Sequence, residues 1–418
     1  MQLHNVLTGK RETFTPQGET ATVYVCGITP YDTTHLGHAF TYTSFDILIR
    51  YLEFLGHPVK YVQNVTDIDD DILRKAAEVG DDWQAVGNRW TAHFIRDMIA
   101  LNVRPPDRFP RATSVIAEMQ ETISALLAAG YAYEVAGNVY FHIDDDEDFG
   151  KLSRIPRAEM LPVANERGNH PDDPHKRDPL DFVLWQAQAE GEPAWDSPWG
   201  PGRPGWHIEC STMATEYLGD TIDIHGGGAD LLFPHHECEI AQAEGATGQE
   251  PFVRFWLHTA MVHHEGEKMS KSLGNLIMVR DLLDQGWHPD ALRLYLGRHH
   301  YRDVWEFHAS SLEAAAVLAG RLRAALAATG GTGDPLSARG ALNSFTTAMN
   351  HDLDTATAIS IMEQFAIQIE RVAGTGRDIS GAQEALRQMA AVFGLYLDAA
   401  APEERVQTGW EEHLQRFL

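Results

Sequence analysis

The chain has 418 residues, 44% of them hydrophobic, and a formal net charge of −27 at pH 7. This length exceeds what one compact core usually holds and predicts a molecule of two or three parts. The negative charge argues against DNA or another large polyanion as a partner, because such ligands are usually bound by basic surfaces. No apolar run reaches the roughly 20 residues that span a bilayer, and the amino-terminal residues do not resemble a signal peptide. We therefore expect a cytoplasmic protein that does not contact a membrane.

Strand and helix patterns alternate in the first part of the chain. Residues 21–26 form a strand-like run, a turn follows, and a helix is predicted from about 38 to 55. A second strand is predicted at 58–65, and a helical stretch begins near Asp69. This order predicts an α/β fold with a Rossmann-like parallel sheet, in which ligands bind at the carboxyl ends of the strands.

The rest of the chain departs from this pattern and returns to it. An insertion is expected at 111–204, with a strand-like run at 138–143 and an acidic, proline-rich stretch after it. The parallel pattern resumes near 222–224 and 252–257, and an alanine- and leucine-rich helix bundle begins near residue 312. We expect five segments: 1–110 and 205–260 as two halves of the Rossmann-like domain, 111–204 as an inserted connective region, 261–311 as a lysine loop with a stem-contact region, and 312–418 as the bundle.

Two short motifs indicate that the protein uses ATP. His35-Leu36-Gly37-His38 places imidazoles at a helix start, where they can meet a triphosphate, and its glycine lets an adenine ring lie against the backbone. Lys268-Met269-Ser270-Lys271-Ser272 supplies two ammonium groups for an α-phosphate under attack. Either motif alone could be a polar surface segment, but the pair in this order favours adenylate formation. We expect His35, His38, Lys268 and Lys271 to be catalytic, and ATP with Mg²⁺ to contact Thr34, Gly37, His38, Met269, Ser270 and Lys271.

A zinc site is a second hypothesis from the residues. Cys26 ends the first strand, Cys210 lies far along the chain, and His235 precedes Glu239 by four residues, which would place both on one face of a helix. Two thiolates, an imidazole and a carboxylate suit Zn²⁺. Scattered cysteines could instead be small buried apolar side chains. Cys238 could also reach the face of His235, so the residue pattern leaves the ligand set open.

Five stretches of the sequence form a recognisable set: YVCGITPYDTTHLGHA at 24–39, QNVTDID at 63–69, GRPGWHIEC at 202–210, DIHGGGADLLFPHHE at 223–237 and EKMSKSLGN at 267–275. Together they resemble the cysteine-activating class I synthetases, a family that includes cysteinyl-tRNA synthetases and mycothiol ligases. The resemblance implies a class I (HUP-type) catalytic domain with one zinc ion, held by Cys26, Cys210, His235 and Glu239. It also implies that Thr66, Trp206 and Asp230 surround a bound cysteine. The expected substrate-binding residues are these three together with Gly27 and Thr29.

The implied reaction is activation of L-cysteine by ATP to cysteinyl adenylate and pyrophosphate, followed by attack of a nucleophile on the mixed anhydride. Cysteine and serine differ by one atom, and a shaped pocket alone would separate them by only a few kcal/mol at most. A zinc ion that takes the substrate thiolate as a ligand would select by softness. An attacking amine must be neutral, so a nearby carboxylate is useful as a base, and Asp230 or Asp32 is expected in this role.

The acceptor is predicted to be the small amine of glucosaminyl-inositol, as in mycothiol biosynthesis. The run at 27–32 and the segment at 352–355 resemble the mycothiol ligases, no basic module follows the bundle, and no lysine follows Lys271, which makes a poor surface for RNA. Glu239 and the run at 271–275 are closer to the tRNA enzymes, so a compact cysteinyl-tRNA synthetase that uses tRNA is the alternative. A catalytically silent homologue is a third hypothesis, against which the intact histidine and lysine motifs argue.

Overall fold

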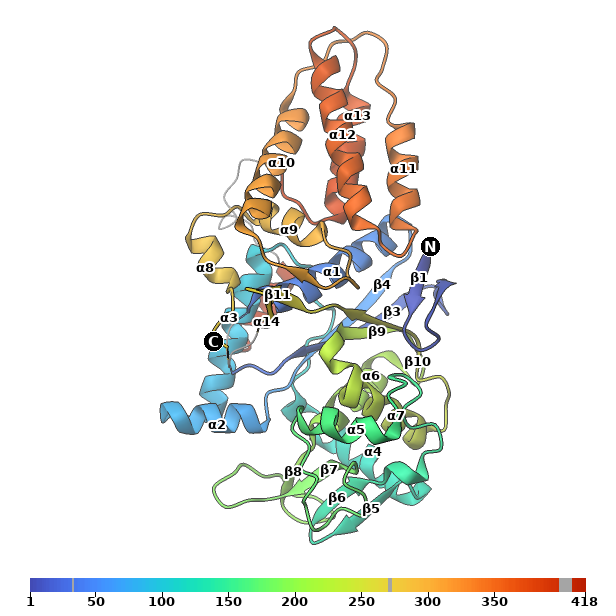
Figure 1. The fold of residues 1–418 in the computed structure, drawn as a ribbon, viewed down its shortest axis with the longest axis vertical. Helices are drawn as coiled ribbons and strands as arrows, with labels where there is room; N and C mark the ends of the chain where they lie inside the picture. Colours follow the sequence, from blue (N-terminus) through green and yellow to red (C-terminus); the bar gives the residue numbers. More distant parts are fainter. Residues whose placement is uncertain (32–33, 270–272, 398–407) are drawn as a thin grey trace.

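The computed structural model describes residues 1–31, 34–269, 273–397 and 408–418. Along its longest axis, an antiparallel sheet region lies at one end, a parallel sheet in the middle and a helix bundle at the other end (Figure 1). No helix in these described ranges is long and apolar enough to cross a membrane.

The central sheet has four parallel strands. Its order is β10 (Val253–Thr259), β9 (Ile222–Gly228), β3 (Ala21–Ile28) and β4 (Val59–Val65). The strands are nearly continuous runs of buried residues, as expected for a parallel sheet that is covered on both faces. The predicted α/β fold with a parallel sheet is therefore confirmed, and the carboxyl ends of all four strands lie along one edge.

Five helices of the described residues belong to the domain that contains the parallel sheet. They are α1 (Leu36–Phe54), α2 (Asp70–Val79), α3 (Trp83–Ala100), α6 (Trp206–Leu218) and α7 (Glu237–Thr247). Helix α1 begins earlier than the sequence pattern predicts, because the side chain of His35 accepts hydrogen bonds from the backbone N–H groups of Gly37 and His38. Asp69 caps α2 in the same manner, so a polar side chain marks the start of both α1 and α2.

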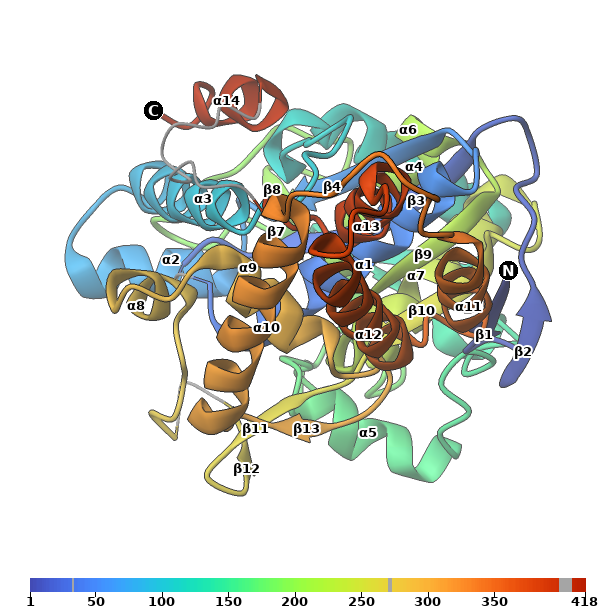
Figure 2. The same cartoon turned by 90° about the horizontal axis from the view of Figure 1, so that it is seen from above.

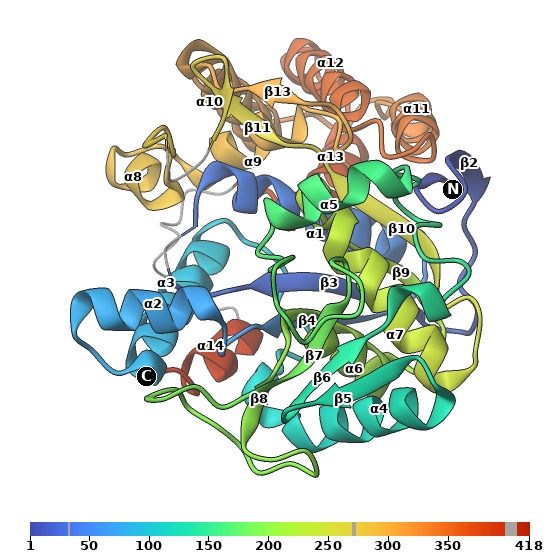
Figure 3. The same ribbon diagram turned by 60° about the horizontal axis from the view of Figure 1, so that its bottom comes forward.

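The segment between α3 and α6 forms an antiparallel sheet at the end of the molecule opposite the bundle (Figure 3). Its order is β5 (Ala132–Val135), β6 (Asn138–Phe141), β7 (Phe182–Ala187) and β8 (Gly202–Pro204), and it is accompanied by η1 (Ala112–Ser114), α4 (Ile116–Ala129), η2 (Ile143–Asp145) and α5 (Arg157–Asn165). One hydrophobic cluster contains Trp185 of β7 together with Cys26 and Cys210. The two cysteines therefore lie where this region packs on the parallel sheet.

Lys268, the first residue of the lysine motif, belongs to a small sheet between the central domain and the bundle. Strand β11 (Val262–His264) pairs with β12 (Glu267–Lys268) and β13 (Trp305–Glu306), and α8 (Val279–Asp284) and α9 (Pro289–Gly297) lie in the connection. The bundle consists of α10 (Ala309–Ala327), α11 (Arg339–Met349), α12 (Thr355–Ala373) and α13 (Ser380–Val392).

Polar contacts attach the bundle and both chain ends to the central domain. The carboxylate of Asp352, just before α12, accepts hydrogen bonds from the backbone N–H of His4 at 2.8 Å and from the hydroxyl of Tyr301 at 2.7 Å. His4 belongs to a hairpin of β1 (Gln2–Asn5) and β2 (Lys10–Thr13). The carboxyl-terminal α14 (Thr408–Leu414) packs beside α3 (Figure 2), with the buried indole of Trp410 donating to the Val103 carbonyl.

Candidate functional site

Two cysteines from distant segments meet near the carboxyl edge of the sheet. Cys26 lies near the end of β3 and Cys210 lies in α6, and their Sγ atoms are 3.8 Å apart. Both side chains are buried. Two sulfurs bound tetrahedrally to one zinc at about 2.3 Å are separated by about 3.8 Å. The cysteine pair therefore has the separation that a shared zinc ion requires.

His235 and Glu239 lie beside this pair. Glu239 Oε1 is 3.1 Å from His235 Nε2 and 3.5 Å from Cys26 Sγ. His235 belongs to the π-helical segment η4 (Leu232–His236), which runs directly into α7, and the non-helical Phe233, with φ −140° and ψ 134°, lies before His235. His235 and Glu239 therefore face each other as the i, i+4 spacing predicted.

A second group of four potential metal ligands overlaps the first. This second group was not predicted from the sequence. It shares Cys26 and Glu239 and adds His225 of β9 and His236. The Nε2 atoms of His225 and His236 lie 3.5 Å and 3.3 Å from Cys26 Sγ. The only sequence signal for these residues was the density of histidines around 225–236. Cys238 is buried but belongs to neither group of described residues.

The electrostatics of this cluster favour a bound cation. Burial raises the pKa of Glu239, and burial together with Cys210 raises the pKa of Cys26. Burial also opposes ionisation of Cys210, yet contacts with Cys26 and His235 bring its pKa down to about 7. Glu239 Oε2 is buried and has no hydrogen-bond partner among the described residues. A bound cation would offset the cost of ionising these buried donors, so the donor set fits a zinc ion, which would be held by these side chains.

Outer contacts orient the histidines of the cluster. His235 Nδ1 is 2.8 Å from His207 Nδ1, and His236 Nδ1 is 2.7 Å from His258 Nε2. Such contacts at the second ring nitrogen fix the direction in which a ligating histidine points. Trp206 stacks on His235 with ring centroids 4.3 Å apart. The predicted cysteine-pocket residue Trp206 thus contacts the predicted metal ligand.

Close backbone packing shapes the predicted cysteine pocket on the side of β3 and β4. Gly27 N donates to Asn64 Oδ1 at 2.7 Å, and a Cβ at Gly27 would lie 1.6 Å from the Asn64 carbonyl oxygen. Only glycine fits this approach. Asn64 Nδ2 in turn donates to Thr66 Oγ1 at 3.2 Å, and Thr66 N donates to the Ile28 carbonyl. The carbonyl of Thr29, the next residue, accepts from Tyr31 N.

The histidine motif forms the first turn of α1. The rings of His35 and His38 stack with centroids 3.9 Å apart and an interplanar angle of 20°. A Cβ at Gly37 would lie 2.9 Å from the His35 ring, so glycine keeps this turn open. Backbone N–H groups at a helix start attract phosphate oxygens, which places the motif well for a triphosphate. Thr34, just before it, is buried.

Three charged side chains from separate segments meet over the carboxyl edge. Asp230 Oδ2, just after β9, lies 3.7 Å from Lys268 Nζ of β12 and 3.5 Å from Arg167 Nη1, which follows α5. The predicted residues Asp230 and Lys268 are thus together, and Met269 is buried beside the lysine. Arg167 was not predicted, because nothing in the sequence shows that the inserted region reaches this carboxylate. The predicted residues Asp32, Ser270 and Lys271 lie outside the described residues.

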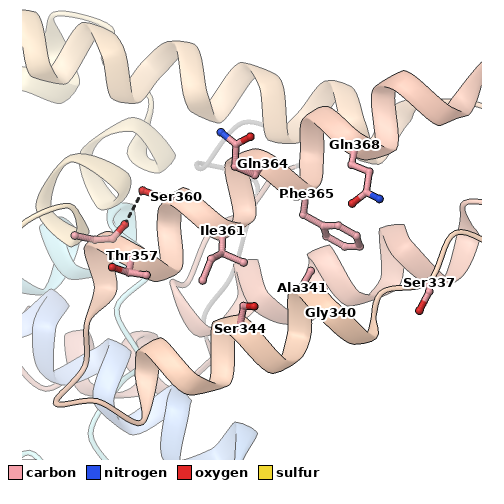
Figure 4. A pocket seen from close by; sticks show the side chains of 11 residues that line it. Ser337, Gly340, Ala341, Ser344, Thr357, Ser360, Ile361, Gln364, Phe365 and Gln368 are labelled. Carbon is pink, nitrogen blue, oxygen red and sulfur yellow. Dashed lines mark hydrogen bonds between the residues drawn. The ribbon is translucent and has the colours of Figure 1, made fainter.

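A groove of about 720 Å³ lies elsewhere, between α11 and α12 of the bundle. Figure 4 shows small polar side chains such as Ser344 and Ser360 along it, with Phe365 at its side. None of the residues predicted to bind cysteine, ATP or zinc lines this groove, so it gives no support to cysteine activation.

The sequence of the chain matches a known family over most of its length. Residues 13–317 match the family described as tRNA synthetases class I (C) catalytic domain, and residues 344–398 match the DALR domain. The chain therefore belongs to the cysteine-activating class I synthetases. Like other members of this family, it is an ATP-dependent cysteine ligase.

Relatives of both kinds of ligase are similar to this chain. The L-cysteine:1D-myo-inositol 2-amino-2-deoxy-alpha-D-glucopyranoside ligase of Thermobifida fusca is 47% identical over 366 residues, covering 88% of each chain. The same ligase of Thermomonospora curvata is 44% identical, covering 95% of this chain and 94% of the relative. The cysteine–tRNA ligase of Dehalococcoides mccartyi is 42% identical, covering 96% and 88%. Identity alone does not separate the two kinds of ligase.

Solved structures agree with the fold. The methionyl-tRNA synthetase of Mycobacterium tuberculosis in complex with methionyl-adenylate aligns with a TM-score of 0.63 at 16% identity, covering 96% of this chain and 93% of that one. At this identity the likeness shows the class I synthetase fold alone.

Proposed function

We propose that this chain transfers activated L-cysteine to the amine of glucosaminyl-inositol and forms an amide, as in mycothiol biosynthesis. Cysteine and ATP give cysteinyl adenylate and pyrophosphate, and the amine then attacks the acyl carbon and releases AMP. The relatives from Thermobifida fusca and Thermomonospora curvata, whose names specify this acceptor, support the proposal over most of both chains.

The charge of the carboxyl-terminal part is the observation that carries this choice of acceptor. Residues 312–418 contain thirteen aspartates and glutamates, eight arginines and no lysine. Several of these arginines are engaged within the fold: Arg321 pairs with Glu363 at 2.9 Å, and Arg377 donates to the carbonyls of Asp334 and Pro335. A tRNA needs a long positive track, whereas a small aminosugar needs only a polar pocket.

The first half-reaction follows from the residues at the carboxyl edge. His35 and His38 would bind the triphosphate at the start of α1. Lys268 would break its ion pair with Asp230 and stabilise the negative charge that develops on the phosphates. Zinc bound by Cys26, Cys210, His235 and Glu239 would supply affinity for the soft thiolate of cysteine over the hydroxyl of serine.

The second half-reaction needs a group that takes a proton from the attacking amine. Asp230 is the described candidate, because its carboxylate lies at the strand end beside Lys268 and Arg167. Asp32, the other candidate from the sequence, is outside the described residues. Two cations lie beside the partly exposed Asp230 carboxylate, and this pairing favours an orienting role for it.

A cysteinyl-tRNA synthetase is the second candidate function. The relative from Dehalococcoides mccartyi, named a cysteine–tRNA ligase, covers as much of this chain as the aminosugar ligases do. The test is to give the purified protein cysteine, ATP and either glucosaminyl-inositol or a cysteine tRNA at moderate salt. We expect the amide product and little charged tRNA. Efficient tRNA charging without amide would replace the proposed function by the alternative.

A further inference from the structure

The histidine motif is joined by backbone hydrogen bonds to the segment that follows the lysine motif. Leu36 N donates to the Ile277 carbonyl at 2.9 Å, and Val279 N donates to the Thr34 carbonyl at 3.0 Å. His35 and Met278 form an antiparallel bridge between these two bonds. We call residues 34–36 and 277–279 the motif ladder. It holds the histidine motif beside the segment that follows the lysine motif.

Asp97 of α3 pairs with the residue that follows one strand of the motif ladder. Its Oδ1 accepts a hydrogen bond from Arg280 Nη2 at 2.8 Å, and Arg280 directly follows the ladder residue Val279. The Asp97 side chain is 2% exposed, whereas that of Arg280 is 40% exposed. On the other strand, the Thr34 hydroxyl lies close enough to act on the ionisation of Asp97. Asp97 is therefore a buried carboxyl group that interacts with Thr34 of one strand and with Arg280, the residue after the other strand.

The remaining polar atoms of Asp97 and Thr34 are buried near each other. Asp97 Oδ2 and Thr34 Oγ1 are both buried, and neither has a hydrogen-bond partner within the described part of the chain. Burial raises the pKa of Asp97, and Arg280 and Thr34 oppose this rise. Burial of this carboxyl group is costly unless Arg280 and Thr34 keep their positions, so Asp97 ties the two together.

We propose that Asp97 is a positioning residue for adenylate formation, which acts through Arg280 and Thr34 to fix the histidine motif relative to the segment after the lysine motif. Neither Asp97 nor Arg280 need touch ATP in this role. The inference rests on cysteine activation by ATP, which is the activity of the family, and is independent of the acceptor.

Removal of the Arg280 charge tests the proposal with little risk to folding, because this side chain is half-exposed. Arg280→Gln should lower kcat/KM for ATP in cysteine-dependent pyrophosphate exchange by about tenfold or more, since small displacements of groups that align a substrate slow its reaction strongly. The KM for cysteine and the zinc content should stay within about twofold of the wild type. Arg280→Lys, which can keep the ion pair, should restore most of the rate.

Asp97→Asn tests the same contact from its buried side. It should reproduce the loss seen in Arg280→Gln, and the double variant should be no worse than either single variant, because both changes break one contact. Additive losses would show instead that Arg280 acts directly on ATP, and would overturn the positioning role of Asp97.

The fold contains a matched control pair. Arg254 pairs with Asp223 at 2.6 Å, with side chains 30% and 2% exposed, at the opposite, amino-terminal edge of β9 and β10. Arg254→Gln should leave the KM for ATP unchanged. The shift in melting temperature caused by ATP alone, which needs no turnover, should fall in Arg280→Gln and not in Arg254→Gln. Equal effects of the two arginine variants in both measurements would contradict the proposal.

Discussion

The Sγ atoms of Cys26 and Cys210 lie 3.8 Å apart although 184 positions separate the two residues in the sequence. One sulfur comes from the carboxyl end of a central strand and the other from the helix that follows the inserted region. Their proximity depends on how the inserted region packs against the sheet, so metal content reports on this arrangement as well as on the site.

Replacement of either cysteine should remove the metal. We expect about one zinc per chain in the wild type, and much less in Cys26→Ser or Cys210→Ser, because a hydroxyl is a poor zinc ligand at neutral pH. Cys238→Ser is the matched control, since this buried thiol lies outside both donor groups. Metal analysis after dialysis measures the effect. Full zinc content in both of the first two variants, or its loss in the control, would contradict the ligand assignment.

Histidine variants should distinguish the two overlapping donor groups. If zinc is held by Cys26, Cys210, His235 and Glu239, then His235→Asn should reduce zinc affinity by at least about tenfold. His225→Asn should reduce it less, because His225 belongs only to the second group. Competition with a chromogenic chelator gives the two affinities. The reverse order would show that His225 and His236 hold the ion.

The lysine of β12 should matter mainly for the chemical step. Lys268→Ala should slow cysteine-dependent pyrophosphate exchange by about a hundredfold with little change in the KM for cysteine, since its charge is needed where negative charge develops. Lys60→Ala is a suitable control, because this exposed lysine donates to the Tyr217 carbonyl at 2.6 Å, near the amino end of β4. A rise in the KM for cysteine as large as the loss in kcat would argue for a binding role.

The raised pKa of Asp69 should make the stability of the protein depend on pH. Burial, with Asp71 and Asp70 nearby, raises its pKa from 3.8 to about 6. The carboxyl group of Asp69 thus binds a proton more tightly in the folded protein than in the unfolded chain. Protonated Asp69 therefore stabilises the fold at low pH, and this stabilisation is lost as pH rises through about 6. Asp69→Asn, which can still cap α2, should therefore become more stable than the wild type by roughly 2 kcal/mol above pH 6, and the difference should vanish near pH 4.

Urea unfolding between pH 4 and 7.5 measures this difference. Asp82→Asn provides the control, because Asp82 caps α3 at an exposed position with a bond to Ala85 N at 3.0 Å. A constant difference between Asp69→Asn and the wild type over the whole range would show that Asp69 titrates alike in both states.

The sequence predicted the central fold because its signals are local. Strand-like runs near 21–26 and 58–65 correspond to β3 and β4, since buried β-branched and aromatic residues there fit only a covered sheet. The start of α1 was missed by two positions, because the His35 side chain caps it and histidine is not a usual capping signal.

The details of the site depend on contacts that a sequence pattern does not show. Regular helical spacing correctly predicted that His235 and Glu239 face each other, but it did not show that His236 also reaches Cys26. Arg167 reaches Asp230 because the segment after α5 lies near the end of β9, and α5 itself contacts η4. Such placements follow from tertiary packing, which residue spacing does not encode.

The most direct test of the proposed function is a single-turnover chase. The protein is loaded with radiolabelled cysteine and ATP, the complex with cysteinyl adenylate is isolated, and either glucosaminyl-inositol or cysteine tRNA is added. We predict that the aminosugar discharges the adenylate well above the rate of spontaneous hydrolysis and yields the amide, while tRNA leaves that rate unchanged. Rapid discharge by tRNA to cysteinyl-tRNA, with no amide from the aminosugar, would contradict the proposal.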